Sequence, residues 1–92
     1  MSEADETPLR RNPDVAFREL TEEEGGVLLH LPTGSYHGVN AVGALVWDLL
    51  DGERTPTDVV SAVREQVEDA PDQLDSEVRA FIAALRERNL VV

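Results

Sequence analysis

The chain contains no cysteine and no lysine, and aromatic residues make up only 4% of it. Without cysteine it cannot form a disulfide, a thiolate nucleophile or a thiolate metal site. Its positive charge comes from eight arginines, which stand against 19 acidic residues and leave a formal net charge of -11. This charge repels nucleic-acid phosphates at long range, so no binding to nucleic acid is expected.

Long apolar runs are also missing. No stretch approaches the roughly 20 apolar residues of a membrane-spanning helix. The start MSEADETP is acidic and polar, whereas a secretory signal is first basic and then apolar. We therefore expect a cytoplasmic protein that does not associate with a membrane. The 41% of apolar residues in a chain of 92 is enough for the core of one small domain.

The first third of the chain predicts a mobile tail and then a sheet. Residues 1–12 carry both charge signs, a proline and little apolar content, so we expect a disordered acidic tail before a folded domain at 13–92. DVAFREL alternates apolar and polar residues, as a half-buried strand does. VLLHL (27–31) and SYHGV (35–39), joined by the turn PTG, predict two further strands of an antiparallel meander.

Three helices are expected after the strands. Asn40 suits the cap of a helix over about 41–50, which is apolar around nearly its whole circumference and should be buried. Thr55, Pro56 and Asp58 favour the start of a second helix. Its apolar face consists of Val59, Val60, Val63 and Val67.

The third helix is expected over about 71–88. Its apolar stripe consists of Leu74, Val78, Phe81 and Leu85, with Ile82 at the edge. The closing NLVV is expected to extend over the core. The predicted fold is thus α+β: a winged-helix-like domain with a three-stranded antiparallel sheet followed by three helices.

The sequence offers no pattern for catalysis. His30 and His37 lie in neighbouring predicted strands without an acidic strand residue nearby, so we interpret them as ordinary strand residues and not as metal ligands. The serines have no base at a suggestive spacing, and no glycine-rich phosphate loop is present. We therefore expect no enzymatic activity, no cofactor and no metal.

One stretch carries a family resemblance. GSYHGVNAVGALVWDLLDGERTPTDVVSAV resembles the PqqD-like family of small peptide-binding domains, also called RiPP recognition elements, in which a strand, an asparagine, an apolar helix and a DG-x-x-T turn follow in this order. The resemblance covers about Val15 to Val92, with Asn89 where a glycine is common. The branch that looks most similar is the stand-alone partner proteins of lasso-peptide biosynthesis, on the basis of Gly34, Tyr36, Val39, Asn40, Gly43 and Ala44.

The resemblance implies a non-catalytic adaptor. Such domains capture the leader segment of a ribosomally made precursor peptide and present it to a separate modifying enzyme, here expected to be a cysteine protease that removes lasso-peptide leaders. An open sheet edge can take up an extended peptide as a further strand. The resemblance places that peptide between the third strand and the third helix. The expected peptide-binding residues are Ser35, Tyr36, His37, Gly38, Val39, Asp75, Arg79, Ile82 and Arg86.

Other interpretations remain open from sequence. The nearer alternative is a PqqD-like peptide chaperone for a radical enzyme in pyrroloquinoline quinone or related biosynthesis. An alternative of another class is a winged-helix transcription regulator, although the third helix has only three arginines among several acidic residues. At the level of single residues, Tyr36 can equally pack on the sheet, Arg79 and Arg86 can be solvated, and Ile82 can belong to the core or to the groove.

Overall fold

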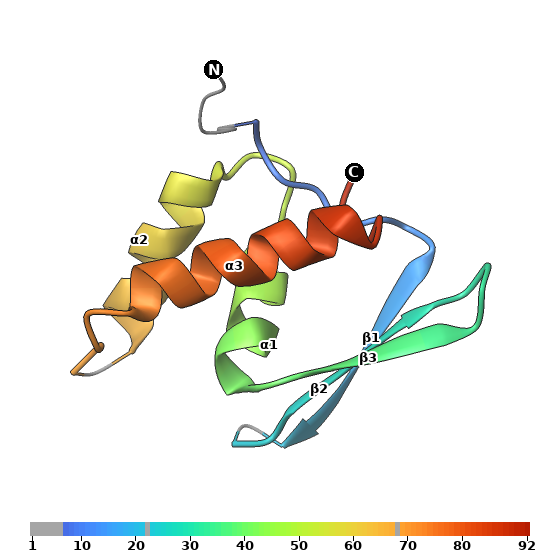
Figure 1. Cartoon of the computed structure of the whole chain (residues 1–92), viewed down its shortest axis with the longest axis horizontal. Helices are drawn as coiled ribbons and strands as arrows, with labels where there is room; N and C mark the ends of the chain where they lie inside the picture. Colours follow the sequence, from blue (N-terminus) through green and yellow to red (C-terminus); the bar gives the residue numbers. More distant parts are fainter. Residues whose placement is uncertain (1–6, 22, 68) are drawn as a thin grey trace.

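The computed structural model describes residues 7–21, 23–67 and 69–92. Within them, three strands precede three helices, which confirms the predicted α+β class and its winged-helix-like order of elements. The elements are β1 (Val15–Thr21), β2 (Gly25–His30), β3 (Ser35–Val39), α1 (Ala41–Asp48), α2 (Pro56–Gln66) and α3 (Leu74–Glu87). The helices lie to one side and one end of the sheet, and β1 and β3 form its two edges (Figure 1).

The sheet is the predicted antiparallel meander, in the order β1-β2-β3. β2 begins at Gly25, two residues before the predicted start. Gly25 has a φ of +87°, and a Cβ atom there would lie 2.1 Å from the Val39 carbonyl oxygen, so the start of β2 and the end of β3 approach closely because no side chain intervenes. The close approach fixes β3 to the middle strand at its last residue.

Two helix starts follow the capping signals in the sequence. The Asn40 side chain accepts a 2.8 Å hydrogen bond from the Gly43 N–H at the start of α1. Thr55 and Asp58 form a complete capping box at the start of α2, with Pro56 in its first turn. Because β3 ends at Val39 and α1 starts at Ala41, only Asn40 separates the strand from the helix.

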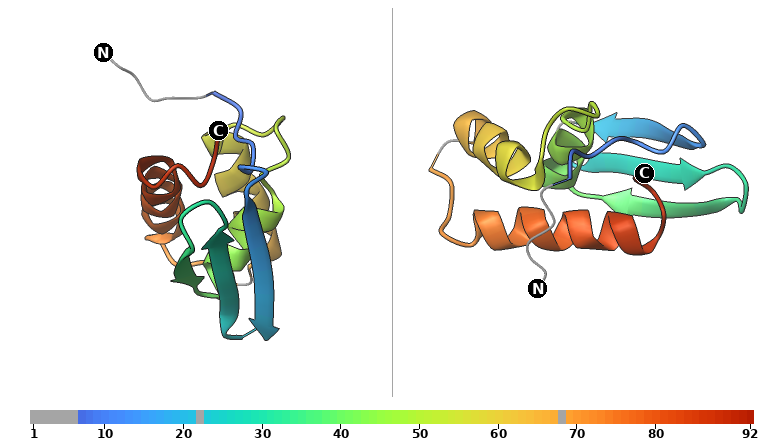
Figure 2. Two further views of the ribbon diagram at one scale, coloured as in Figure 1. Left: turned by 90° about the vertical axis from the view of Figure 1, so that its right-hand side faces the viewer. Right: turned by 90° about the horizontal axis from the view of Figure 1, so that it is seen from above.

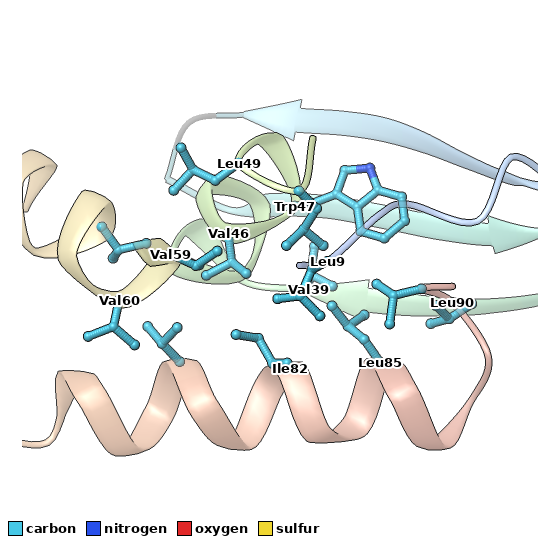
Figure 3. Packing of buried hydrophobic residues seen from close by; sticks show 14 of the residues in the cluster. Leu9, Val39, Val46, Trp47, Leu49, Val59, Val60, Ile82, Leu85 and Leu90 are labelled. Atoms are coloured by element: carbon cyan, nitrogen blue, oxygen red, sulfur yellow. The ribbon is translucent and has the colours of Figure 1, made fainter. Parts of the chain in front are cut away.

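The core lies between the sheet and the three helices, and α3 runs along its far side (Figure 3). In α3, Ile82 is 2% exposed and points into this core, whereas Phe81 is only half-buried. α3 begins at Leu74 and not at Pro71, because residues 71–73 form a turn in which the Leu74 N–H bonds to the Pro71 carbonyl at 3.0 Å. The chain end covers the core as predicted, with Leu90 and Val91 buried.

The prediction that the tail extends to residue 12 is wrong for residues 9–12. Leu9 is 2% exposed and belongs to the core. Its N–H donates to the Arg54 carbonyl at 2.9 Å, and its carbonyl accepts from the Gly52 N–H at 2.7 Å. The Asn12 N–H donates to the Leu90 carbonyl at 3.1 Å. The folded unit therefore begins before Pro13, and residues 1–6 of the expected tail lie outside the described residues.

No helix among the described residues has the length and apolar content needed to cross a membrane.

Candidate peptide-binding groove

A groove separates β3 from α3. Figure 2 shows α3 beside β3, on the side of the sheet away from β1, in both of its views. The hollow between them has a volume of about 270 Å³. It is lined by Leu28, His37, Gly38, Val39, Phe81, Ala84, Leu85, Arg88 and Leu90. One wall is thus the edge strand of the sheet, and the other is the C-terminal half of the last helix.

The hydrogen-bond register of the sheet decides which backbone groups face this groove. The Leu31 N–H donates to the Asp14 carbonyl at 2.9 Å, at the end of the β1–β2 ladder. Hydrogen-bonded pairs of an antiparallel ladder recur at every second residue. Counting back from Leu31, Leu29 and Val27 therefore bond to β1, and the alternate residues of β2, including Leu28, bond to β3.

Two residues of β3 consequently present their backbone to the open edge. Leu28 is the partner of His37 in the β2–β3 ladder, so the backbone of His37 is used within the sheet. The N–H and C=O groups of Tyr36 and Gly38 point the other way, toward α3. A peptide that extends the sheet would bond to these two residues.

The side chains of β3 alternate between the two faces of the sheet. His37 and Val39 lie on the inner face together with buried Leu28, and His37 is half-buried. Tyr36 lies on the outer face and is 73% exposed. The Tyr36 side chain is therefore neither packed against α3 nor buried against the sheet.

The groove is apolar at one end and charged at the other. Toward the N-terminal half of α3, the Phe81 ring lies close to Val39 and Gly43, since a Cβ atom on Gly43 would be 3.1 Å from the Val39 Cβ and 3.2 Å from the Phe81 ring. Toward the C-terminal end, the Arg88 guanidinium contacts the His37 ring at 2.8 Å across the groove. No carboxylate is among the described residues that line it.

The four α3 residues predicted for the site do not lie on this side of the helix. Asp75 forms an ion pair and hydrogen bond with Arg64 of α2. Arg79 donates to the Thr57 hydroxyl of α2 at 3.1 Å. Both residues therefore face α2 instead of β3.

Ile82 and Arg86 also face elsewhere. Ile82 is a core residue, as its 2% exposure shows. Arg86 lines a separate hollow with Leu9 and Val91. The prediction that these side chains border the β3 side of α3 is thus wrong, while the predicted β3 residues His37, Gly38 and Val39 do line the groove.

Phe81, Ala84 and Arg88 take the place of the predicted α3 residues. They are spaced by three and four residues and so form one row along the helix. The sequence places Phe81 and Ile82 equally well on the apolar stripe, because Leu74, Val78 and Leu85 are at helical spacing from both. The sequence signal for this row was an aromatic residue, Phe81, at helical spacing from an arginine near the helix end, Arg88.

A larger hollow of about 420 Å³ lies at the other edge of the sheet, between β1, α1 and the end of α2. Its apolar lining includes Phe17 and Leu45, but Glu19 and Asp48 also line it. The β1 edge has a register shift between Glu19 and Thr21, which interrupts a regular ladder. A long added strand fits the regular β3 edge better than this one.

Metal-ligating clusters of three or more histidine and acidic side chains are absent from the part of the chain that the structure describes. His30 bonds instead to the Thr33 hydroxyl at 2.9 Å, and His37 contacts Arg88. The two histidines thus contact different partners, one three residues away in the chain and the other on the far wall of the groove.

Three strands followed by three helices, with one open strand edge beside an apolar groove, define the class of small winged-helix-like α+β domains. The family model described as Coenzyme PQQ synthesis protein D (PqqD) matches residues 25–91. The chain belongs to the PqqD family. No curated protein matches it at a significant level.

Two solved structures are similar over nearly the whole chain. TbiB1 in complex with the TbiA(beta) leader peptide is 30% identical, with a TM-score of 0.71, and the match covers 89% of this chain and 93% of that one. Lasso peptide synthetase B1 complexed with the leader peptide is 22% identical, also with a TM-score of 0.71, covering 92% and 98%. The second likeness concerns the fold alone.

Proposed function

We propose that this chain is a non-catalytic adaptor that binds the leader segment of a ribosomally synthesised precursor peptide and presents it to a separate modifying enzyme. The observation that carries the proposal is the open backbone of Tyr36 and Gly38 beside the apolar groove against α3. The solved relative at 30% identity, TbiB1 with its leader peptide, supports it.

Strand addition at this edge gives both affinity and selectivity. The backbone of an extended peptide bonds to Tyr36 and Gly38 whatever its sequence, which provides affinity. Every second peptide side chain then points into the groove, where Phe81, Leu85 and Leu90 offer apolar surface. These inward side chains provide the selectivity.

The enzyme that receives the leader is expected to be a leader protease of the cysteine class, acting in the cytoplasm. This chain has no cysteine and therefore cannot supply the nucleophile itself. The sequence resemblance to the lasso-peptide branch favours this partner over a radical enzyme of pyrroloquinoline quinone biosynthesis.

The test of leader binding uses a precursor peptide encoded beside this chain. Its synthetic leader is titrated into the isotope-labelled protein while backbone amide shifts are followed. We expect micromolar to nanomolar affinity, which corresponds to about 8 to 12 kcal/mol, with the largest shifts at Tyr36, Gly38 and the row formed by Phe81, Ala84 and Arg88. Shifts confined to residues 59–67 of α2, with β3 unmoved, would refute this site.

The enzyme partner is tested by a cleavage assay that contains the purified protease, the precursor and this chain. Each component is omitted in turn. Cleavage should require the protease and be accelerated by this chain, and the chain alone should cleave nothing. Stimulation of a radical enzyme without any effect on a protease would favour the chaperone alternative. Salt-dependent binding to DNA would instead revive the transcription regulator.

A further inference from the structure

The contact between His37 and Arg88 joins the two walls of the groove. The Arg88 guanidinium nitrogen lies 2.8 Å from the His37 Nδ1 atom. A guanidinium has only donors, so the Nδ1 atom accepts this hydrogen bond and the neutral ring carries its proton on Nε2. The positive charge of Arg88 is thus bonded to an uncharged partner.

No carboxylate among the described residues of the groove neutralises that charge. The described residues that line it include no aspartate or glutamate. The ion pairs that join Arg54 to Asp51 and Arg64 to Asp75 do not involve Arg88. A carboxylate adds a negative charge and two acceptor oxygens that an arginine can bind at once, whereas the neutral His37 ring offers a single acceptor. A carboxylate brought into the groove would therefore replace His37 as the partner of Arg88.

The sheet register fixes where such a carboxylate has to stand in a bound peptide. Peptide residues bonded to Tyr36 and Gly38 point their side chains to the outer face, as these two residues do. The peptide residues opposite His37 and Val39 point inward, toward α3. The one opposite Val39 meets Phe81, and the one opposite His37 meets Arg88.

We propose that Arg88 is a specificity-determining residue that binds a carboxylate of the leader, two residues away from an apolar side chain that contacts Phe81. All strand pairs of the sheet are antiparallel, so the leader is assigned the same direction. The apolar residue then precedes the acidic one, in the pattern apolar-x-Asp/Glu. This inference rests on the proposed function, because it concerns the same groove.

The experiment selects short random peptides, displayed on phage, against the full chain. Peptides that bind the Tyr36→Pro variant as tightly as the wild type are discarded, since they do not use the open edge. We expect the selected sequences to share the pattern apolar-x-Asp/Glu. The same selection against Arg88→Gln should keep the apolar position and lose the acidic one.

Individual peptides then measure the effect. Replacing the acidic residue of a selected peptide by its amide should weaken binding to the wild type about tenfold and leave binding to Arg88→Gln unchanged. Arg88→Glu should bind the same peptide with lysine at this position better than with glutamate. Arg86→Gln is the matched control, because it removes the same charge two residues earlier on another side of α3. Its affinity should equal that of the wild type, and thermal unfolding checks that each variant folds.

Each other outcome decides against the inference in a recognisable way. Peptides that depend on Tyr36 but show no acidic preference would overturn the role of Arg88 and leave leader binding intact. The same conclusion would follow if Arg86→Gln lowered their affinity as much as Arg88→Gln does. A preference in the reverse order, acidic before apolar, would overturn the assigned direction. If no peptide is selected through the β3 edge, the proposed function fails and this inference with it.

Discussion

Two proline substitutions one residue apart in β3 should have opposite effects. The Tyr36 N–H faces the open edge, and the side chain is 73% exposed, so Tyr36→Pro removes no hydrogen bond of the sheet and little buried surface. Proline is tolerated at edge positions of this kind. We expect the free energy of unfolding to fall by about 1 kcal/mol or less.

His37→Pro should instead destabilise the fold. The His37 N–H bonds within the sheet to Leu28, a core residue with 0% exposure. Proline leaves the Leu28 carbonyl buried without its partner, which costs about 1 to 3 kcal/mol. In a domain of this size each kcal/mol lowers the melting temperature by about 4 to 8 °C, so a fall of roughly 4 to 24 °C follows.

Binding should show the reverse order. Calorimetric titration with a leader or selected peptide, at a temperature where all variants are folded, compares each proline with its alanine control. Tyr36→Pro loses a backbone donor to the peptide, which is worth about 0.5 to 1.5 kcal/mol, or about a further two- to twelvefold in affinity beyond Tyr36→Ala. If Tyr36→Pro binds like Tyr36→Ala, or if His37→Pro melts like the wild type, the register derived for β3 is incorrect.

Five further substitutions, one of them a control, test other parts of the structure. Leu9→Ala should cost about 2 to 5 kcal/mol because the side chain is 2% exposed, whereas Leu20→Ala, at 56% exposure, should leave thermal unfolding nearly unchanged. Asn40→Ala removes the cap of α1 and should cost about 1 kcal/mol in denaturant unfolding. Phe81→Ala, in the half-buried wall of the groove, should weaken peptide binding about tenfold while the fold survives. The hydrogen bond from the Glu53 backbone N–H lowers the pKa of the Asp51 carboxyl below its ordinary value of 3.8. The charged carboxylate therefore stabilises the fold above that pH, and this stabilisation is lost as the pH falls through the lowered pKa. Acid unfolding curves of Asp51→Asn should lack this pH-dependent contribution.

The elements most readily predicted from sequence were those with local signals. Asn40 and Thr55 stand where helix caps are needed, and the structure uses both as caps, with Asp58 completing the capping box at Thr55. The turn PTG before residues 35–39 and Asn40 after them predict β3 with the bounds that the structure has. Signals of this kind depend only on neighbours in the chain, so they can be identified without knowledge of the tertiary fold.

Contacts between distant parts of the chain were not predictable in the same way. Leu9 stands alone among polar and charged residues, so no periodicity marks it as buried. Its backbone partners, Gly52 and Arg54, follow more than forty residues later. The side of α3 that faces β3 was missed for a related reason, because Phe81 and Ile82 fit the same stripe and only packing against α1 and α2 decides between them.

The direct junction between β3 and α1 explains how a small domain can offer a rigid edge. Asn40 alone separates the strand from a helix whose Val46 and Trp47 are buried, and Val39 itself is 8% exposed. The edge that is left open to a partner is therefore anchored in the core at its last residue. Only the incoming peptide then has to be ordered on binding, which lowers the entropic cost of association. The β1 edge has no such junction and is interrupted by its register shift. Both edges carry open backbone groups, but an extended peptide is therefore expected to bind at the β3 edge.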